Sequence, residues 1–425
     1  MRPVVAASCT PLALLACTAA PTRPNASAKL VILDGAVITE NPAQPQASAL
    51  AVRDGKIAYV GDAAGARRWI GSDTRVLRVA GATVLPGLID SHIHVMEGAL
   101  SQSACPFADA QLDVAQIAPN IRDSAARTPG TGWVMVVQLN AAGFHADRHD
   151  LDAILPDRPL LLWAADGHDG WVNSAALRLA GVDRHSADPP NGTIARDADG
   201  EPNGFLVDSA LEPVSRLIEQ PGTAERERVL LKTLGDLAQA GITTFMEANT
   251  SEATVRSYVE LARKQLLHAR VSMALRCDDI NSETEFARLA ALRALAGSQP
   301  LLRADLIKLF ADGVMEYPAH TAAMLEPYLE ANGQPGTNYG PTYLEPASLA
   351  LFVRRAADQG FGLHVHAIGD RAARIALDAF ADARAWQHAL LQHRAPGAGS
   401  AGRPAQVSNP QCHRLAAVAV GAARQ

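Results

Sequence analysis

The second half of the chain alternates short apolar segments with amphipathic helical ones, and this alternation constrains the fold more than any other feature. It is typical of parallel βα units. The segments with strand character are residues 84–94, 242–246, 270–275, 306–310 and 361–366. A helix is predicted at residues 225–240, where Leu230 and Leu234 fall on one face, and Gly241 is placed to end it. The sequence therefore predicts an α/β fold built on a parallel sheet.

The chain before this body has a different character. Residues 26–84 contain short strand-like segments separated by turn residues, and Asp34-Gly35 and Asp54-Gly55 are hairpin signals because glycine accepts a positive φ. We therefore predict a small N-terminal β unit at residues 26–84 and a body of parallel βα units at residues 85–384. Residues 100–230, rich in Pro, Gly and Asp, form a long insertion between the first two strands of that body.

The first 25 residues have the pattern of a secretory signal: Arg2, a short apolar stretch, then small residues. The segment before Cys17 resembles a lipoprotein signal, in which this cysteine becomes the lipid-bearing N-terminus. Cleavage near Ala19-Ala20 is one alternative, and an uncleaved apolar tail on a cytoplasmic protein is another. We expect an exported protein, periplasmic or membrane-anchored, that contacts a membrane only through an N-terminal lipid, since no later segment approaches ~20 apolar residues.

Composition narrows the functional classes. The 425 residues carry 38 basic and 44 acidic side chains, a net charge of −6 and a hydrophobic fraction of 48%. These values exclude a disordered chain, a coiled-coil fibre and a basic nucleic-acid binder. Five scattered cysteines are too few for a disulfide scaffold. The oligomeric state stays open.

Two histidines end the first apolar strand. His92 and His94 are two residues apart, so on a strand they point to the same face. Two converging imidazoles at the C-terminal end of a parallel strand can bind a divalent metal such as zinc or iron. A purely structural histidine pair is the alternative.

Three further residues on later strands are candidate metal ligands. Lys308 lies in the middle of an apolar strand, where burial makes a charged ammonium costly. Either a salt bridge to Asp312 or a carbamate formed with CO₂, an anionic ligand able to bridge two cations, would resolve this cost. His364 and His366 form a second His-x-His pair. Either one is a candidate ligand, with a packed and hydrogen-bonded histidine as the alternative.

Taken in order, these segments resemble the metal-dependent amidohydrolase superfamily and, within it, the amidohydrolase-3 branch of YtcJ-like proteins. The resemblance covers residues 29–384. The matching segments are residues 85–94 (LPGLIDSHIH), 166–174 (DGHDGWVNS), 192–197 (GTIARD), 308–313 (KLFADG) and 364–372 (HVHAIGDRA).

The resemblance implies a (β/α)₈ barrel flanked by a β-sandwich that both ends of the chain build, with catalysis at the C-terminal face of the strands. It implies hydrolysis of an amide-type C–N bond, other than a peptide bond, in a small molecule. One or two divalent ions, expected to be zinc, would activate the water. The resemblance assigns metal binding to His92, His94, Lys308 (carbamylated) and His366, and substrate binding to His168, Trp171 and Asp312. A packed, loop-anchoring pair is the alternative for His168 and Trp171.

The sequence also departs from this family. The family takes a proton-handling Asp from the last strand and a further His from the sixth, yet no Asp or Glu follows Asp382, so no catalytic residue is assigned. Five strands are found where eight are expected, and residues 385–425 lack a helical or strand period. We therefore predict a truncated or frame-disrupted metal-dependent hydrolase that lacks the last-strand Asp on which turnover depends, with a non-catalytic fragment or pseudo-enzyme binding module as the alternative. A phosphoesterase on the same barrel is disfavoured, because nothing marks a phosphate site.

Overall fold

The computed structural model describes residues 27–393, except 104, 107–110, 128–129, 131, 142, 166, 317–318 and 331. The predicted signal segment at residues 1–25, with Cys17, lies outside the described residues, as does the predicted tail beyond residue 393. The chain divides into two compact units, residues 1–87 and 88–425. No described helix has both the length and the apolar character needed to cross a membrane.

The first unit consists of two small sheets and one short helix. The four-stranded sheet has the order β5-β4-β1-β6, and the three-stranded sheet the order β3-β2-β7. Its elements are β1 (Leu30–Leu33), β2 (Ala36–Ile38), β3 (Gln46–Ala47), β4 (Ala49–Arg53), β5 (Lys56–Gly61), α1 (Ala63–Arg67), β6 (Arg75–Arg78) and β7 (Thr83–Val84). Its small core is formed by side chains of β1, β4 and α1.

One of the two predicted hairpin turns is confirmed and the other is wrong. At Asp54-Gly55, both residues have positive φ, and strands β4 and β5 pair antiparallel up to Arg53 and Lys56. Asp34 also has a positive φ, of 65°. Strand β1 nevertheless pairs with β4 and β6, whereas β2 pairs with β3 and β7. The turn therefore passes the chain from one sheet to the other, because a left-handed residue permits a sharp reversal without fixing the partner of the next strand.

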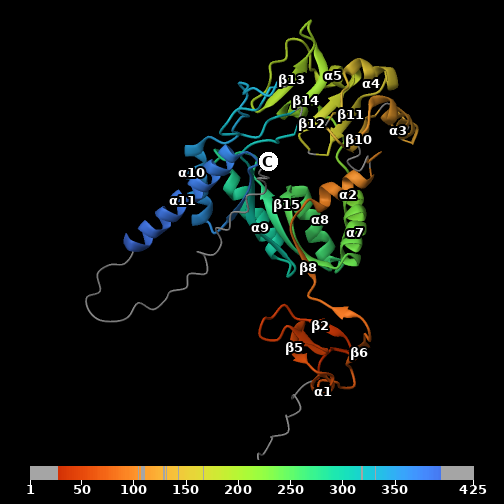
Figure 1. The fold of residues 1–425 in the computed structure, drawn as a ribbon, viewed down its shortest axis with the longest axis vertical. Coiled ribbons are helices and arrows are strands. Elements are labelled where there is room, and N and C mark those ends of the chain that lie inside the picture. The colour runs from red at the N-terminus through yellow and green to blue at the C-terminus, as the bar shows by residue number, and fades with distance from the viewer. Residues whose placement is uncertain are drawn as a thin grey trace, which may run out of the picture. The chain divides into compact units, whose positions relative to one another are not determined.

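The second unit is built on a parallel sheet of five strands in the order β18-β17-β16-β15-β8. Two of these strands, β8 and β15, are labelled in Figure 1. The strands are β8 (Leu88–Ile93), β15 (Ile242–Thr250), β16 (Arg270–Arg276), β17 (Leu302–Phe310) and β18 (Gly362–His366). All four pairings are parallel. The predicted α/β class and its five strands are confirmed. The sheet is curled into half of a barrel rather than closed, within the part of the chain that the structure describes.

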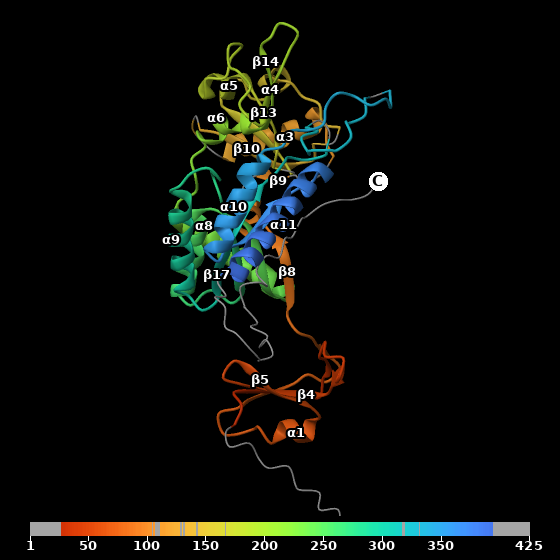
Figure 2. The ribbon, with the colours of Figure 1, turned by 90° about the vertical axis from the view of Figure 1, so that its left-hand side faces the viewer.

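Helices follow the strands as the periodicity predicts. They are α2 (Val95–Ser103), α7 (Thr223–Gln239), α8 (Glu252–Arg263), α9 (Glu285–Gly297), α10 (Pro346–Asp358) and α11 (Asp370–His393). Helix α7 matches the predicted helix at residues 225–240: Leu230 and Leu234 are buried, and Gly241 follows with a φ of 82°. Helices α10 and α11 lie side by side (Figure 2), joined by a bidentate pair between Arg354 and Asp382.

Helix α11 corrects one prediction. It continues to His393, into the segment at residues 385–425 that was expected to lack a helical period. The extension follows from cooperativity, since adding a residue to an existing helix needs no new nucleus.

The insertion forms a second sheet, of six strands, in the order β13-β14-β12-β11-β10-β9. Its strands are β9 (Cys105–Pro106), β10 (Val134–Leu139), β11 (Leu160–Ala164), β12 (Asp169–Val172), β13 (Gly192–Arg196) and β14 (Pro202–Asp208). Its helices are α3 (Val114–Arg127), α4 (Arg148–Ile154), α5 (Ser174–Ala180), the 3₁₀ turn η1 (Ser209–Leu211) and α6 (Glu212–Ser215). Two apolar clusters cover the faces of this sheet. The insertion is therefore an ordered layer with its own core.

Candidate metal centre

His92 and His364 meet across the opening of the curled sheet. Nε2 of His364 lies 2.9 Å from Nδ1 of His92, and the ring centroids are 4.8 Å apart. His92 stands near the end of β8 and His364 in the middle of β18, which are the opposite edges of the five-stranded sheet. The two edges can only approach in this way because the sheet curls. Histidines from two separate strands therefore converge at this opening, and the one from β18 is His364.

His94 extends this cluster. Its ring centroid is 5.2 Å from that of His92, at an interplanar angle of 77°. Its Nδ1 atom lies 3.3 Å from Oε2 of Glu97, in the first turn of α2. The other carboxylate oxygen of Glu97 accepts a hydrogen bond of 3.0 Å from Nδ2 of Asn249 on β15. The sequence analysis did not identify Glu97, although its position three residues after His94 places it one helical turn away.

Lys308 lies on β17, beside His364 in the strand register. Its side chain is among the largest that are fully buried, and Nζ stands 4.6 Å from the centroid of the Phe310 ring. Burial lowers the pKa of Lys308 to about 8, although the Glu97 carboxylate acts in the opposite direction. A neutral amine is therefore accessible near neutral pH.

A salt bridge from Asp312 to Lys308 was one of the two ways in which the cost of burying the Lys308 ammonium could be offset. The structure, which describes both residues, does not show this salt bridge. The Asp312 carboxylate is fully buried and accepts hydrogen bonds from the backbone N–H groups of Ala323, Ile368 and Gly369. It joins the loop after β17 to the start of α11. Burial raises its pKa in spite of these hydrogen bonds. The geometry gives Asp312, which the resemblance assigned to substrate binding, a role in positioning this loop.

The histidines of the cluster are held neutral. Burial is the main cause that lowers the pKa of His92 to about 4 and that of His364 to about 3, and the Lys308 charge adds to both shifts. The pKa of His94 is lowered by the same two causes. At neutral pH each imidazole therefore has a lone pair on one nitrogen, which is the form that binds metals.

His366, the predicted fifth-strand ligand, has different neighbours from His364. Its Nε2 lies 2.9 Å from the carbonyl oxygen of Gly313, and its ring lies 5.4 Å from that of Phe310 and 5.6 Å from that of His168. Burial lowers its pKa to about 4. Of the two histidines on β18, His364 is the one that the structure brings against His92.

The two insertion residues assigned to substrate binding are placed differently from each other. Nδ1 of His168 lies 2.6 Å from Oδ1 of Asp208, whose other oxygen accepts a 2.6 Å hydrogen bond from the Tyr343 hydroxyl. His168 therefore faces His366, held by a chain of groups that the sequence did not reveal. Trp171 is only 2% exposed and packs between Phe144 and Phe205 in the core of the insertion. Its surroundings are those of a core residue.

The donors fit a divalent metal in their chemistry. Three neutral imidazoles and a buried lysine converge, and Nδ1 of His94 is a buried polar atom that makes no hydrogen bond. Within the described ranges, however, no group of three or more His, Cys, Asp and Glu side chains is arranged to hold a metal ion. The potential ligands stand in pairs, His92 with His364 and His94 with Glu97. Binding would require these pairs to close around the ion.

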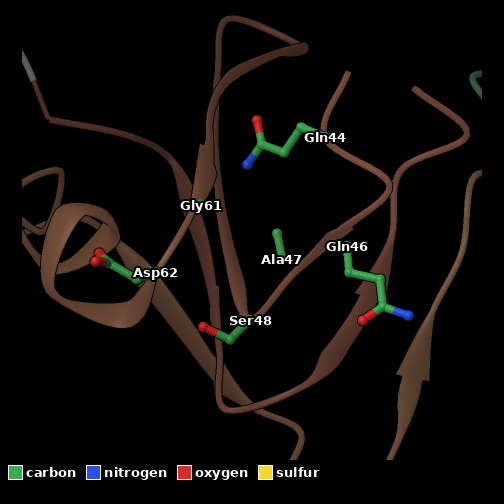
Figure 3. Close-up of a pocket in the computed structure, with 6 residues that line it drawn as sticks. All are labelled: Gln44, Gln46, Ala47, Ser48, Gly61 and Asp62. Atoms are coloured by element: carbon green, nitrogen blue, oxygen red, sulfur yellow. The ribbon is translucent and has the colours of Figure 1, made fainter. Parts of the chain in front are cut away.

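Two surface hollows lie among other residues. One, in the N-terminal unit, is drawn in Figure 3 and is lined by Gln44, Gln46, Ala47, Ser48, Gly61 and Asp62. The other is lined by Ala262, Arg263, Gln265, Leu267, Gln299, Pro300 and Leu301. Neither contains a predicted site residue, and neither gathers titratable side chains suited to catalysis.

Comparison with known proteins places these features in a family. A sequence model of the amidohydrolase family matches residues 79–425. The chain is 32% identical over 370 residues to the exoenzymes regulatory protein AepA of Pectobacterium carotovorum subsp. carotovorum, covering 84% of this chain and 77% of that protein. It is 29% identical over 343 residues to the putative amidohydrolase YtcJ of Bacillus subtilis, covering 78% of this chain and 62% of YtcJ.

Longer relatives and a solved structure agree with this placement. The protein LONG AFTER FAR-RED 3 of Arabidopsis thaliana is 28% identical over 399 residues, and the match covers 88% of this chain but only 66% of that protein. An uncharacterized metal-dependent hydrolase from Pyrococcus furiosus shares the fold, with a TM-score of 0.61 at 23% identity, over 84% of this chain and 70% of that one. The sequence match, the half-barrel and the histidines at its opening together identify the chain as a member of the amidohydrolase family, in the YtcJ-like branch that the sequence predicts.

Proposed function

We propose that the protein is a metal-dependent hydrolase that cleaves an amide-type C–N bond in a small molecule. The observation that carries this proposal is the contact between His92 and His364 at 2.9 Å, with His94 and Lys308 beside it at the opening of the half-barrel. Family membership supports the hydrolase class. A bound divalent cation would supply Lewis acidity and lower the pKa of water from 15.7 to about 7.

The residues we propose as ligands are His92, His94 and a histidine of β18. Burial keeps their imidazoles neutral, so each ring already has one nitrogen with a lone pair. In the His92–His364 contact one of the two facing nitrogens carries the ring proton, which has to move to the other nitrogen of that ring before both can bind the same ion. Ligand nitrogens of a tetrahedral zinc site stand roughly 3.3 Å apart, so Nε2 of His364 and Nδ1 of His92, which are 2.9 Å apart, would need to separate by only a few tenths of an ångström. Zinc is our proposal for the metal because it accepts imidazole ligands readily.

Lys308 is proposed as an anionic ligand after carbamylation. The neutral amine attacks CO₂, an N–C bond forms, and the amine loses a proton to water, which leaves a carbamate with one negative charge. The low pKa of Lys308, about 8, favours the neutral amine that this step requires. A carbamate would also remove the cost of a buried ammonium.

The second candidate is a chain without catalytic activity, as a pseudo-enzyme binding module. One observation favours it: the described His, Cys, Asp and Glu side chains do not yet form a closed ligand set. It differs from the first candidate in its metal content. A hydrolase should retain about one or two ions per chain, whereas an incomplete site should lose them in mild chelation.

The test is metal analysis combined with a substrate screen. The protein is purified with zinc and bicarbonate, passed over a desalting column, and its zinc content is measured. It is then assayed against N-formyl and N-acyl amines. The N-substituted formamides are included because a relative from Arthrobacter pascens, 26% identical over 362 residues, is named N-substituted formamide deformylase.

His92→Ala is the test variant, and His268→Ala, at an exposed loop position, is the matched control. We expect loss of zinc and of hydrolysis in His92→Ala and neither loss in the control. A wild-type protein that is folded but binds no zinc would contradict the proposal. Bound zinc without turnover of any amide would favour the pseudo-enzyme.

A further inference from the structure

The His94–Glu97 pair has a geometry that a hydrogen bond does not explain. Nδ1 of His94 lies 3.3 Å from Oε2 of Glu97, yet Nδ1 makes no hydrogen bond within the described part of the chain. The atom is buried, so leaving it without a hydrogen-bond partner costs free energy. A buried imidazole nitrogen next to a carboxylate oxygen, with no proton shared between them, needs another explanation.

The separation matches two ligands of one cation. Zinc lies about 2.0–2.1 Å from a histidine nitrogen and about 2.0–2.2 Å from a carboxylate oxygen, so in a tetrahedral site these two atoms stand roughly 3.3–3.5 Å apart. The His94–Glu97 distance of 3.3 Å lies at the lower end of this range.

Glu97 is held in this orientation by a residue from another strand. Nδ2 of Asn249 on β15 donates a 3.0 Å hydrogen bond to Oε1 of Glu97, which directs Oε2 toward His94. More than half of the Glu97 side chain is exposed, so a cation would not have to enter the protein core to reach it. The pair therefore combines a fixed carboxylate oxygen on an exposed side chain with a buried imidazole nitrogen.

We propose that Glu97 is a direct ligand of the metal and binds it together with His94. This inference rests on the proposed metal-dependent function and adds a carboxylate that the sequence motifs do not assign. The charge balance supports it, because imidazole ligands such as His92, His94 and His364 carry no negative charge and leave a divalent ion without a compensating anion. Glu97 supplies one negative charge, and a carbamate on Lys308 would supply a second.

The geometry also accounts for the two separate pairs of donors. The two pairs are neighbours, because the ring centroids of His92 and His94 are only 5.2 Å apart. His92 contacts His364, and His94 lies next to Glu97. Lys308 lies beside His364 in the register of β17 and β18. A ligand on Lys308 would thus stand within reach of both pairs.

The test compares zinc and cobalt binding in three full-length proteins: wild type, Glu97→Gln and Glu283→Gln. Glu283 is exposed and lies in the loop before α9, so it controls for the loss of one surface carboxylate. Zinc affinity is measured by competition with a chromophoric chelator. Cobalt substitution reports the ligand set through its visible absorption bands, and circular dichroism checks that each variant is folded.

We expect Glu97→Gln to weaken zinc binding by about tenfold or more and to change the cobalt bands, while Glu283→Gln changes neither. Weaker zinc binding with an unchanged cobalt spectrum would mean that Glu97 only orients His94, and would overturn the inference. Unchanged affinity would overturn it as well. A wild-type protein that binds neither metal would instead reject the proposed function, which keeps the two failures distinct.

Discussion

His364 and His92 are 272 positions apart in the sequence and belong to the two edge strands of one sheet, yet their ring nitrogens stand 2.9 Å from each other. A flat five-stranded sheet would separate its edges by four interstrand spacings, about 19 Å. The contact therefore requires the barrel-like curl, and the curl in turn explains why strands far apart in the sequence can form one site.

This contact predicts which histidine of β18 matters more for metal binding. We expect His364→Ala to weaken zinc binding by about tenfold or more, and by a larger factor than His366→Ala, because only the His364 ring lies against His92. Chelator competition on the two variants measures this. A larger loss in His366→Ala would show that the ring of His366 turns away from Gly313 and binds the metal, as the sequence resemblance implies.

Much of the fold was predictable because it depends on local patterns. The five strands contain short apolar segments that alternate with amphipathic helices, as in parallel βα units, and helix α7 shows its buried face through Leu230 and Leu234. The histidine pairs were visible because a spacing of two on a strand fixes a common face. These features need no knowledge of which elements later pack together.

The rest depends on contacts that no local pattern encodes. Glu97 is exposed on a helix, and only the arrival of Asn249 from β15 directs it toward His94. The link from His168 through Asp208 to Tyr343 joins the insertion to a loop 135 residues further along the chain. Asp34-Gly35 has the composition of a hairpin, yet the pairing of β1 with β4 and β6 decides where the chain goes.

Glu247 predicts a pH dependence of stability. The side chain is fully buried, and its Oε2 accepts hydrogen bonds from the Tyr258 hydroxyl and the Met96 N–H, at 2.6 and 3.2 Å. Its Oε1 has no hydrogen-bond partner. Burial raises the pKa of Glu247 to about 7. Since the folded pKa lies above the unfolded value, its contribution to stability is complete at acid pH and is lost as the pH rises through about 7.

We therefore expect the free energy of unfolding of the wild type to fall by on the order of 3 kcal/mol from about pH 5 to pH 8, relative to Glu247→Gln. The glutamine keeps an acceptor for Tyr258 and cannot ionise. Urea unfolding in the presence of a chelator measures the difference, with Glu283→Gln as the control. Parallel pH profiles for the wild type and Glu247→Gln would show that Glu247 titrates normally.

Asp312 predicts a stability effect that is independent of any metal. Its carboxylate accepts three backbone N–H groups, from Ala323, Ile368 and Gly369. Asp312→Ala would leave these buried donors without this acceptor, so we expect a loss of about 3 kcal/mol or more in the free energy of unfolding. Asp378→Ala, at an exposed position on α11, should change it by less than about 0.5 kcal/mol. Equal effects in both variants would contradict this role.

Substitution by alanine should have opposite effects on the free energy of unfolding at two glycines of the second unit. A Cβ atom at Gly369 would overlap the backbone carbonyl group of Ala323, whereas a Cβ at Gly235, in the middle of α7, would meet no atom within 4 Å. Gly369→Ala must displace backbone, so we expect it to lower the free energy of unfolding by about 2 kcal/mol or more. Gly235→Ala should raise it by roughly 0.5–1 kcal/mol, because alanine favours the helix. Urea unfolding of both variants measures the two effects. A stable Gly369→Ala would mean that the loop carrying Ala323 is not packed against the start of α11, and the Asp312 hydrogen bonds, which join the same two segments, would fail with it.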